Sequence, residues 1–238
     1  MYSMLEPGRG PQSRTTQLGV LTALVMLAAL LAAFFYAPME RTQGNVQRIF
    51  YIHLPIIWVA YLAFFVAFVS SALFLWKQYD LFDYAAHASA EIGFLFTSLV
   101  LVTGSIWARP IWGTWWSWDA RLTTTLILWF IYGGYLTLRG VMNDDHRSAR
   151  LAAVLGIVGF IDIPIIHQSV VWWRTLHPQT IVLAEGGPAM PPAMLQTLAL
   201  SLLAFSLLYV WLMLNRMKLE SLRAERHRLQ LEQAFGRV

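Results

Sequence analysis

The stretch LPIIWVAYLAFFVAFVSSALFLW, Leu54–Trp76, carries no charged side chain over its whole length. A helix needs about 20 mostly apolar residues to cross the hydrocarbon core of a bilayer, so this stretch is long enough to do so. The rest of the chain has the same character, because 58% of its 238 residues are hydrophobic and 13% are charged, against about 25% charged residues in soluble domains. We therefore expect an all-α integral membrane protein.

Five further segments have the length and polarity of membrane spans. They are Leu18–Tyr36, Ile92–Ala108, Leu122–Leu138, Leu151–Trp173 and Met194–Leu214. Ile92–Ala108 and Leu122–Leu138 are short and are expected to extend beyond their apolar stretch, and Leu151–Trp173 is interrupted by Asp162 and Pro164. Together with Leu54–Trp76, which is the second in chain order, these segments therefore predict six transmembrane helices in a compact bundle.

Lysine and arginine are unevenly divided between the two ends of these helices. Twelve lie in the N-terminal segment, the connections after the second and fourth spans and the C-terminal tail, whereas five lie in the other connections. Cytoplasmic segments carry the excess of positive charge, so both termini are predicted to be cytoplasmic, and no nucleic-acid partner is needed to explain the net charge of +4. Residues 1–217 then form the transmembrane domain with an outer loop over 108–121, and residues 218–238 form a cytoplasmic helical tail.

The predicted outer loop contains the stretch WGTWWSWDARLT, Trp112–Thr123, which holds four of the eleven tryptophans of the chain. Each indole is bulky and has an N–H group that needs a partner when it is buried. Tryptophans also form belts at both membrane interfaces, but a belt does not place four in one loop. With Trp172 and Trp173 after the fifth span, these residues predict a flat aromatic surface on the outer face.

Two histidines flank this aromatic surface at the same predicted membrane level, His53 before the second span and His177 after the fifth. The chain has no cysteine, so thiolate metal sites and disulfides are excluded. Haem suits such a surface, because its ring stacks on indoles, its iron takes axial histidines and its propionates pair with arginine. Arginines that could hold the propionates lie close by in sequence, and the alternative is that they bind lipid headgroups or acidic side chains. These are Arg48, Arg121 and Arg174.

The tryptophan stretch resembles the signature of the WWD family of haem-handling membrane proteins. The six spans and the motifs FYIHLP, residues 50–55, and RTLHP, residues 174–178, resemble its smallest branch, the C-subunit type of the bacterial cytochrome c maturation system, also called haem exporter protein C. The resemblance implies that His53 and His177 are the axial ligands of the haem iron. It also implies a haem platform made of Trp112, Gly113, Trp115, Trp116, Trp118 and Asp119.

The resemblance further implies where such a protein works and with what. It implies a multi-pass protein of the bacterial inner membrane that binds haem b transiently at the periplasmic face. The haem would pass to a membrane-anchored haem chaperone during cytochrome c biogenesis. The implied partners are the ATPase and permease subunits of an ABC transporter and a small single-span subunit. No Walker motif is present, so any ATP hydrolysis is expected from a partner, and we expect an assembly factor rather than an enzyme.

Two other functions compete with haem transfer. A b-type cytochrome that passes electrons to quinone also binds haem through histidines, although such histidines usually lie inside the helix bundle. A permease would need a polar path across the membrane, for which only Glu91, Asp162 and His167 are available. His87 and Glu91 are four residues apart and share a helix face, which favours a local hydrogen bond over a metal site. Asp119 also stands where it could cap the fourth helix.

Overall fold

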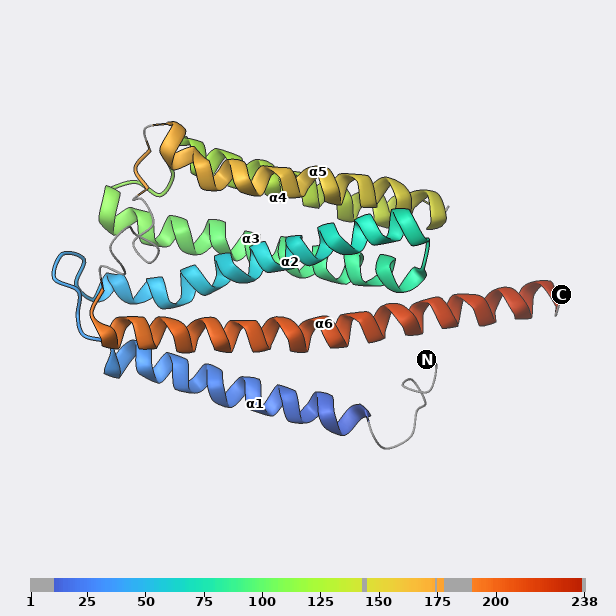
Figure 1. The fold of residues 1–238 in the computed structure, drawn as a ribbon, viewed down its shortest axis with the longest axis horizontal. Coiled ribbons are helices and arrows are strands. Elements are labelled where there is room, and N and C mark those ends of the chain that lie inside the picture. Colours follow the sequence, from blue (N-terminus) through green and yellow to red (C-terminus); the bar gives the residue numbers. More distant parts are fainter. Residues whose placement is uncertain (1–10, 143–144, 174, 178–189, 237–238) are drawn as a thin grey trace.

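The computed structural model describes residues 11–142, 145–173, 175–177 and 190–236. Within these ranges the chain forms six α-helices with a short π-helical and a short 3-10 segment (Figure 1), and its only β contact is an isolated bridge between Glu40 and Gly44. The elements are α1 (Pro11–Leu31), η2 (Ala32–Tyr36), η3 (Asn45–Ile49), α2 (Phe50–Lys77), α3 (Asp80–Trp112), α4 (Ala120–Val141), α5 (Asp145–Trp172) and α6 (Pro192–Phe235).

The helices run side by side and alternate in direction along the chain (Figure 1). Consequently α1, α3 and α5 finish at the same end of the bundle at which α2, α4 and α6 begin. We call this the Trp112 end, after the last residue of α3. The main packing pairs are α2 with α3, α4 with α5, and α1 with α6. Residues from distant parts of the sequence therefore meet at the Trp112 end.

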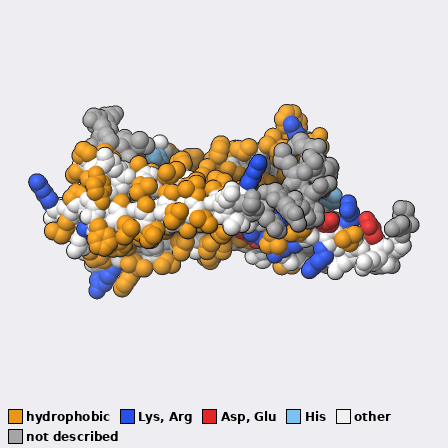
Figure 2. Space-filling view, turned by 90° about the horizontal axis from the view of Figure 1, so that it is seen from below, with side chains coloured by type: hydrophobic (Ala, Val, Ile, Leu, Met, Phe, Trp, Pro, Cys, Tyr) orange, Lys and Arg blue, Asp and Glu red, His pale blue; other side chains and the backbone are white. Residues whose placement is uncertain are grey.

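Five of the helical segments are long and apolar enough to cross a membrane: Arg14–Tyr36, Asn45–Lys77, Asp80–Trp112, His146–Trp172 and Pro192–Gln230. Figure 2 shows hydrophobic side chains over much of the visible face, with Lys and Arg mostly toward its two ends. The prediction of an all-α membrane protein is therefore confirmed for five spans. The sixth, α4, is less apolar because threonine and glycine recur along it, although its 22 residues are about 33 Å long at 1.5 Å per residue. Its membrane crossing and the side on which the termini lie stay predictions.

The observed helices are longer than the predicted spans. Helix α3 continues past Pro110 to Trp112, so the connection to α4 covers only residues 113–119, fewer than the 108–121 expected for the outer loop. Helix α6 is 44 residues long, or about 66 Å, and includes most of the expected tail over 218–238. A single helix therefore joins the bundle to this tail (Figure 1).

Buried aromatic rings fill the centre of the bundle. The Phe64 and Tyr132 rings stack with their centroids 3.8 Å apart, and both side chains are fully buried. Gly93 of α3 lies against the Phe64 ring, since an added Cβ would come within 2.6 Å of its Cδ1 atom. The absence of a side chain at Gly93 thus sets how closely α3 approaches α2.

We predict that Gly93→Ala lowers the free energy of unfolding by about 1–3 kcal/mol, the usual cost of overfilling a packed core. Gly134→Ala is the matched control, because an added Cβ there meets no atom within 4 Å and alanine favours a helix. Thermal unfolding in detergent should give a lower midpoint for Gly93→Ala alone. Equal midpoints for the two variants would contradict the packing argument.

Candidate functional site

His177 lies at the Trp112 end, just beyond α5, and is held by residues of two other elements. Its Nδ1 atom is 3.0 Å from Oδ2 of Asp119, and its ring meets the Trp112 ring edge to face with centroids 4.9 Å apart. Asp119 and Trp112 stand at the two ends of the α3–α4 connection. The described structure therefore brings three of the predicted site residues, His177, Asp119 and Trp112, into direct contact.

Asp119 uses its two carboxylate oxygens for different tasks. Oδ1 accepts the backbone N–H of Leu122 at 2.9 Å and so caps the N-terminus of α4, as its place in the sequence suggested. Oδ2 accepts the Nδ1–H of His177. The cap fixes the carboxylate relative to α4, and the carboxylate in turn fixes the imidazole.

The protonation state of His177 follows from this environment. Burial lowers the pKa of His177, and the Asp119 carboxylate opposes that shift. A pKa below the ordinary value leaves the imidazole neutral at pH 7, with its proton on Nδ1 because an ionised carboxylate can only accept. The lone pair then lies on Nε2, which has no hydrogen bond within the described residues. A neutral imidazole whose other nitrogen donates to a carboxylate is the usual form of a metal-binding histidine.

His53 lies in the first turn of α2, so its expected position in a loop before the helix is wrong. The apolar pattern placed the start of the span at Leu54, and a residue before proline tends to avoid helical conformation. Pro55 nevertheless lies inside α2, five residues after its first residue, and the helix continues through it although proline cannot donate a backbone hydrogen bond. The 3-10 segment η3 leads directly into α2, so the helix begins at Phe50. His53 therefore sits on a rigid element.

The His53 ring is enclosed by side chains of α3. Its Nδ1 atom is 2.7 Å from the Thr103 hydroxyl oxygen, and its ring lies edge to face with the Trp107 ring at a centroid distance of 5.7 Å. Gly104 leaves room for the ring, since a Cβ there would be 3.2 Å from Cε1 of His53. His53 also lies near enough to His177 for a charge on one imidazole to act on the other.

Neither Thr103 nor Trp107 was among the predicted site residues. Both are on the α3 face toward His53, four residues apart and therefore one turn from each other. Their spacing is the only sequence signal for them, because threonine and tryptophan are ordinary residues of an apolar span and do not by themselves indicate a site.

The tryptophan stretch forms the connection between α3 and α4. Gly113 ends α3 with a φ of +78°, and its N–H binds the Arg109 carbonyl at 3.1 Å; this left-handed conformation favours glycine. Trp115 and Trp118 are largely exposed, whereas Trp116 is half-buried and its Nε1 has no partner in the described part of the chain. The connection therefore offers exposed indole faces and one unpaired buried N–H group.

The three arginines suspected of holding propionates differ in their surroundings. Arg121 is half-buried, interacts electrostatically with Tyr61 and Asp119, and has a buried Nε without a partner among the described residues. Arg48 instead donates to the Ala33 carbonyl and, at 3.2 Å, to the Asn45 side chain. Arg174 lies outside the described residues. Of the described pair, Arg121 is thus the one with a buried N–H group that has no partner among the described residues, whereas Arg48 already gives two of its five N–H groups to the protein.

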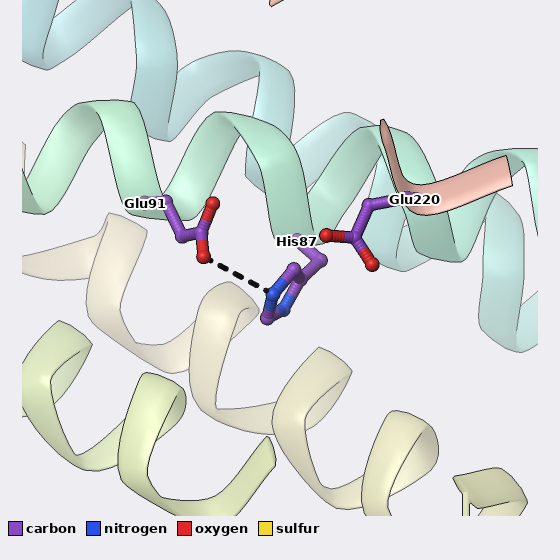
Figure 3. A group of neighbouring side chains, drawn as sticks. All are labelled: His87, Glu91 and Glu220. Carbon is purple, nitrogen blue, oxygen red and sulfur yellow. Dashed lines mark ion pairs between the residues drawn. The ribbon is translucent and has the colours of Figure 1, made fainter. Parts of the chain in front are cut away.

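A second polar cluster lies near the opposite end of the bundle. His87, Glu91 and Glu220 come within 4.8 Å of one another (Figure 3), which is close enough for a metal ion. However, the Arg216 guanidinium binds both carboxylates, with Glu220 at 3.0 Å. His87 Nε2 is 3.5 Å from Glu91. Arg223 also pairs with Glu220 at 2.9 Å, so both carboxylates already have arginine partners, and the cluster ties α6 to α3.

The residues considered for a path across the membrane do not come together. Glu91 belongs to the Arg216 cluster, His167 is exposed on the outside of the bundle, and Asp162 is buried. One carboxylate oxygen of Asp162 has no hydrogen-bond partner within the described residues. Within the described residues these three side chains therefore do not form one polar route.

Comparison with known proteins agrees with these features. The family model for Heme exporter protein C matches residues 11–232. The chain belongs to the heme exporter protein C family. It is 43% identical over 211 residues to heme exporter protein C of Bradyrhizobium diazoefficiens, covering 89% of this chain and 80% of the relative. The corresponding Haemophilus influenzae protein is 39% identical over 96% of both chains.

The family also reaches beyond these bacterial proteins. A cytochrome c biosynthesis ccmC-like mitochondrial protein of Marchantia polymorpha is 43% identical over 149 residues, 63% of each chain. The resemblance noted in the sequence is therefore confirmed at the level of the family. The roles of individual residues in this chain stay predictions.

The two tasks of Asp119 can be separated by substitution. Asparagine caps a helix about as well as aspartate does, whereas alanine loses about 1 kcal/mol. We predict that Asp119→Ala lowers the unfolding midpoint in detergent and that Asp119→Asn does so much less. Asp80→Ala is the control, since Asp80 is exposed in the first turn of α3 and does not occupy its N-cap. A midpoint for Asp119→Ala equal to that of Asp80→Ala would rule out the cap as a source of stability.

Proposed function

We propose that the protein binds haem at the Trp112 end and transfers it to a membrane-anchored haem chaperone during cytochrome c biogenesis. In this proposal the Trp112 end faces the periplasm, the protein lies in the bacterial inner membrane, and both termini are cytoplasmic. The haem is haem b and is bound transiently, as cargo. An ABC transporter, with its ATPase and permease subunits, and a small single-span subunit are the proposed partners.

One observation carries the proposal. His53 and His177 lie at the same end of the bundle on different elements, and each has its Nδ1 engaged by a neighbouring side chain. Each imidazole therefore keeps Nε2 for a ligand, and imidazole nitrogens are common axial ligands of haem iron. The exposed indoles of Trp115 and Trp118 give the macrocycle a surface beside them.

The position of these groups favours transfer over electron transport. The candidate ligands lie at helix ends beside an exposed connection, rather than within the buried centre of the bundle. A haem held at such an end can be reached by a partner without unfolding the helices. The protein supplies orientation and exposure in this mechanism, and the reactivity belongs to haem.

We predict that His53→Ala and His177→Ala each abolish the low-spin spectrum of bound haem and its delivery to the chaperone, because each removes one axial bond. Absorption spectra of the purified protein with and without the chaperone measure the first effect. His146→Ala is the control, since His146 is exposed near the start of α5. Wild-type spectra and delivery in either variant would remove that histidine from the ligand pair.

A further prediction concerns the propionates. Arg121→Gln should weaken binding of haem about tenfold or more, since a hydrogen bond between charged groups contributes about 1.5–3 kcal/mol, and should barely affect haem dimethyl ester. Arg48→Gln should weaken both forms equally, because its guanidinium serves the Ala33 carbonyl. Titration of each variant with the two forms measures this. If Arg121→Gln weakens the binding of haem and of haem dimethyl ester equally, Arg121 does not bind a propionate and its role is structural.

A further inference from the structure

The Thr103 hydroxyl takes part in two consecutive hydrogen bonds, one with His53 and one with a backbone carbonyl. The Thr103 hydroxyl is 2.7 Å from the Leu99 carbonyl, one turn earlier in α3, and 2.7 Å from Nδ1 of His53. A hydroxyl has one proton to donate, and the carbonyl can only accept it. The Thr103 oxygen therefore accepts a hydrogen bond from the Nδ1–H group of His53.

These two hydrogen bonds select one tautomer of the His53 imidazole. With the proton held on Nδ1, the lone pair of the neutral ring lies on Nε2. The ring itself is placed between Gly104 and Trp107, neither of which distinguishes the two nitrogens. Among the described residues, Thr103 is thus the one whose contact determines which nitrogen of His53 is available to a ligand.

Asp119, which accepts the hydrogen bond of His177, differs from Thr103 in charge. Asp119 is a carboxylate that is itself fixed by capping α4, whereas Thr103 is a neutral hydroxyl. A carboxylate that accepts from one ring nitrogen raises the basicity of the other, and a neutral hydroxyl does so less. The two imidazoles are therefore unequal electron donors, although both present Nε2.

We propose that Thr103 is the positioning residue for His53, and that its neutral hydroxyl makes His53 the weaker and first-released of the two axial ligands of haem. The inference rests on the proposed function, because it assumes that both histidines bind one iron. His177, supported by Asp119, then retains the haem while the His53 side opens. Transfer to an acceptor begins on the side of α2 and α3.

The central test is Thr103→Val, which keeps the shape of the side chain and removes the hydroxyl. Without it, His53 can carry its proton on either nitrogen, and the loss of such a supporting contact typically weakens metal binding about 10–100-fold. We expect haem to dissociate into excess apomyoglobin about 10–100-fold faster, and ferric spectra to gain a high-spin component. Thr103→Ser should restore both to near wild type.

Thr137→Val is the matched control. Thr137 makes the same bond to the carbonyl four residues earlier, 2.8 Å to Gly133, but stands exposed in α4 away from the Trp112 end. It should leave dissociation and spectra unchanged. If Thr103→Val does not accumulate, Thr103→Ala provides the same measurement.

The proposed difference in strength between the His53 and His177 ligands can be measured separately, by comparing the haem retained by the two histidine variants. His53→Ala should retain five-coordinate, high-spin haem on His177, whereas His177→Ala should retain much less haem. The opposite order, or wild-type dissociation and spectra for Thr103→Val, would overturn this inference while leaving the proposed function intact. Unchanged spectra in both histidine variants would instead overturn the proposed function.

Discussion

The Asp119 carboxylate is the interaction on which the candidate site depends. Its two oxygens join the first turn of α4 to the imidazole beyond α5, so a local feature of one helix fixes a residue 58 positions away. A carboxylate at a helix N-terminus is also favoured by the helix dipole. The same group thus stabilises a helix and sets the orientation of a side chain suited to metal binding.

Alternation of helix direction explains why so many special residues share one end. Every second connection returns to the Trp112 end, where backbone can leave helical form without being buried in lipid. The apolar middle of the bundle is left to ring packing such as Phe64 on Tyr132. The opposite end carries the ion pairs Arg139–Asp83 and Arg216–Glu220, which join α4 to α3 and stabilise α6.

Hydropathy alone was sufficient to predict most of the fold, because a bilayer demands long apolar helices. It misplaced helix ends, since Pro55 and Pro110 lie inside helices that continue through them. The tryptophan stretch and the two histidines could be found from composition and resemblance. The pairs Asp119–His177 and Thr103–His53 could not, because contacts between residues 58 and 50 positions apart depend on how helices pack, which one sequence does not reveal.

The π-helical turn at the end of α1 has a consequence for the length of that helix. A π turn contains one residue more than an α turn, and here the Ala37 N–H bonds the Ala32 carbonyl at 2.8 Å. The widened turn leaves the Ala33 carbonyl to Arg48, which anchors the segment leading to α2. The extra residue of the π turn therefore shifts the position along the axis of α1 at which the chain leaves this helix and crosses to α2.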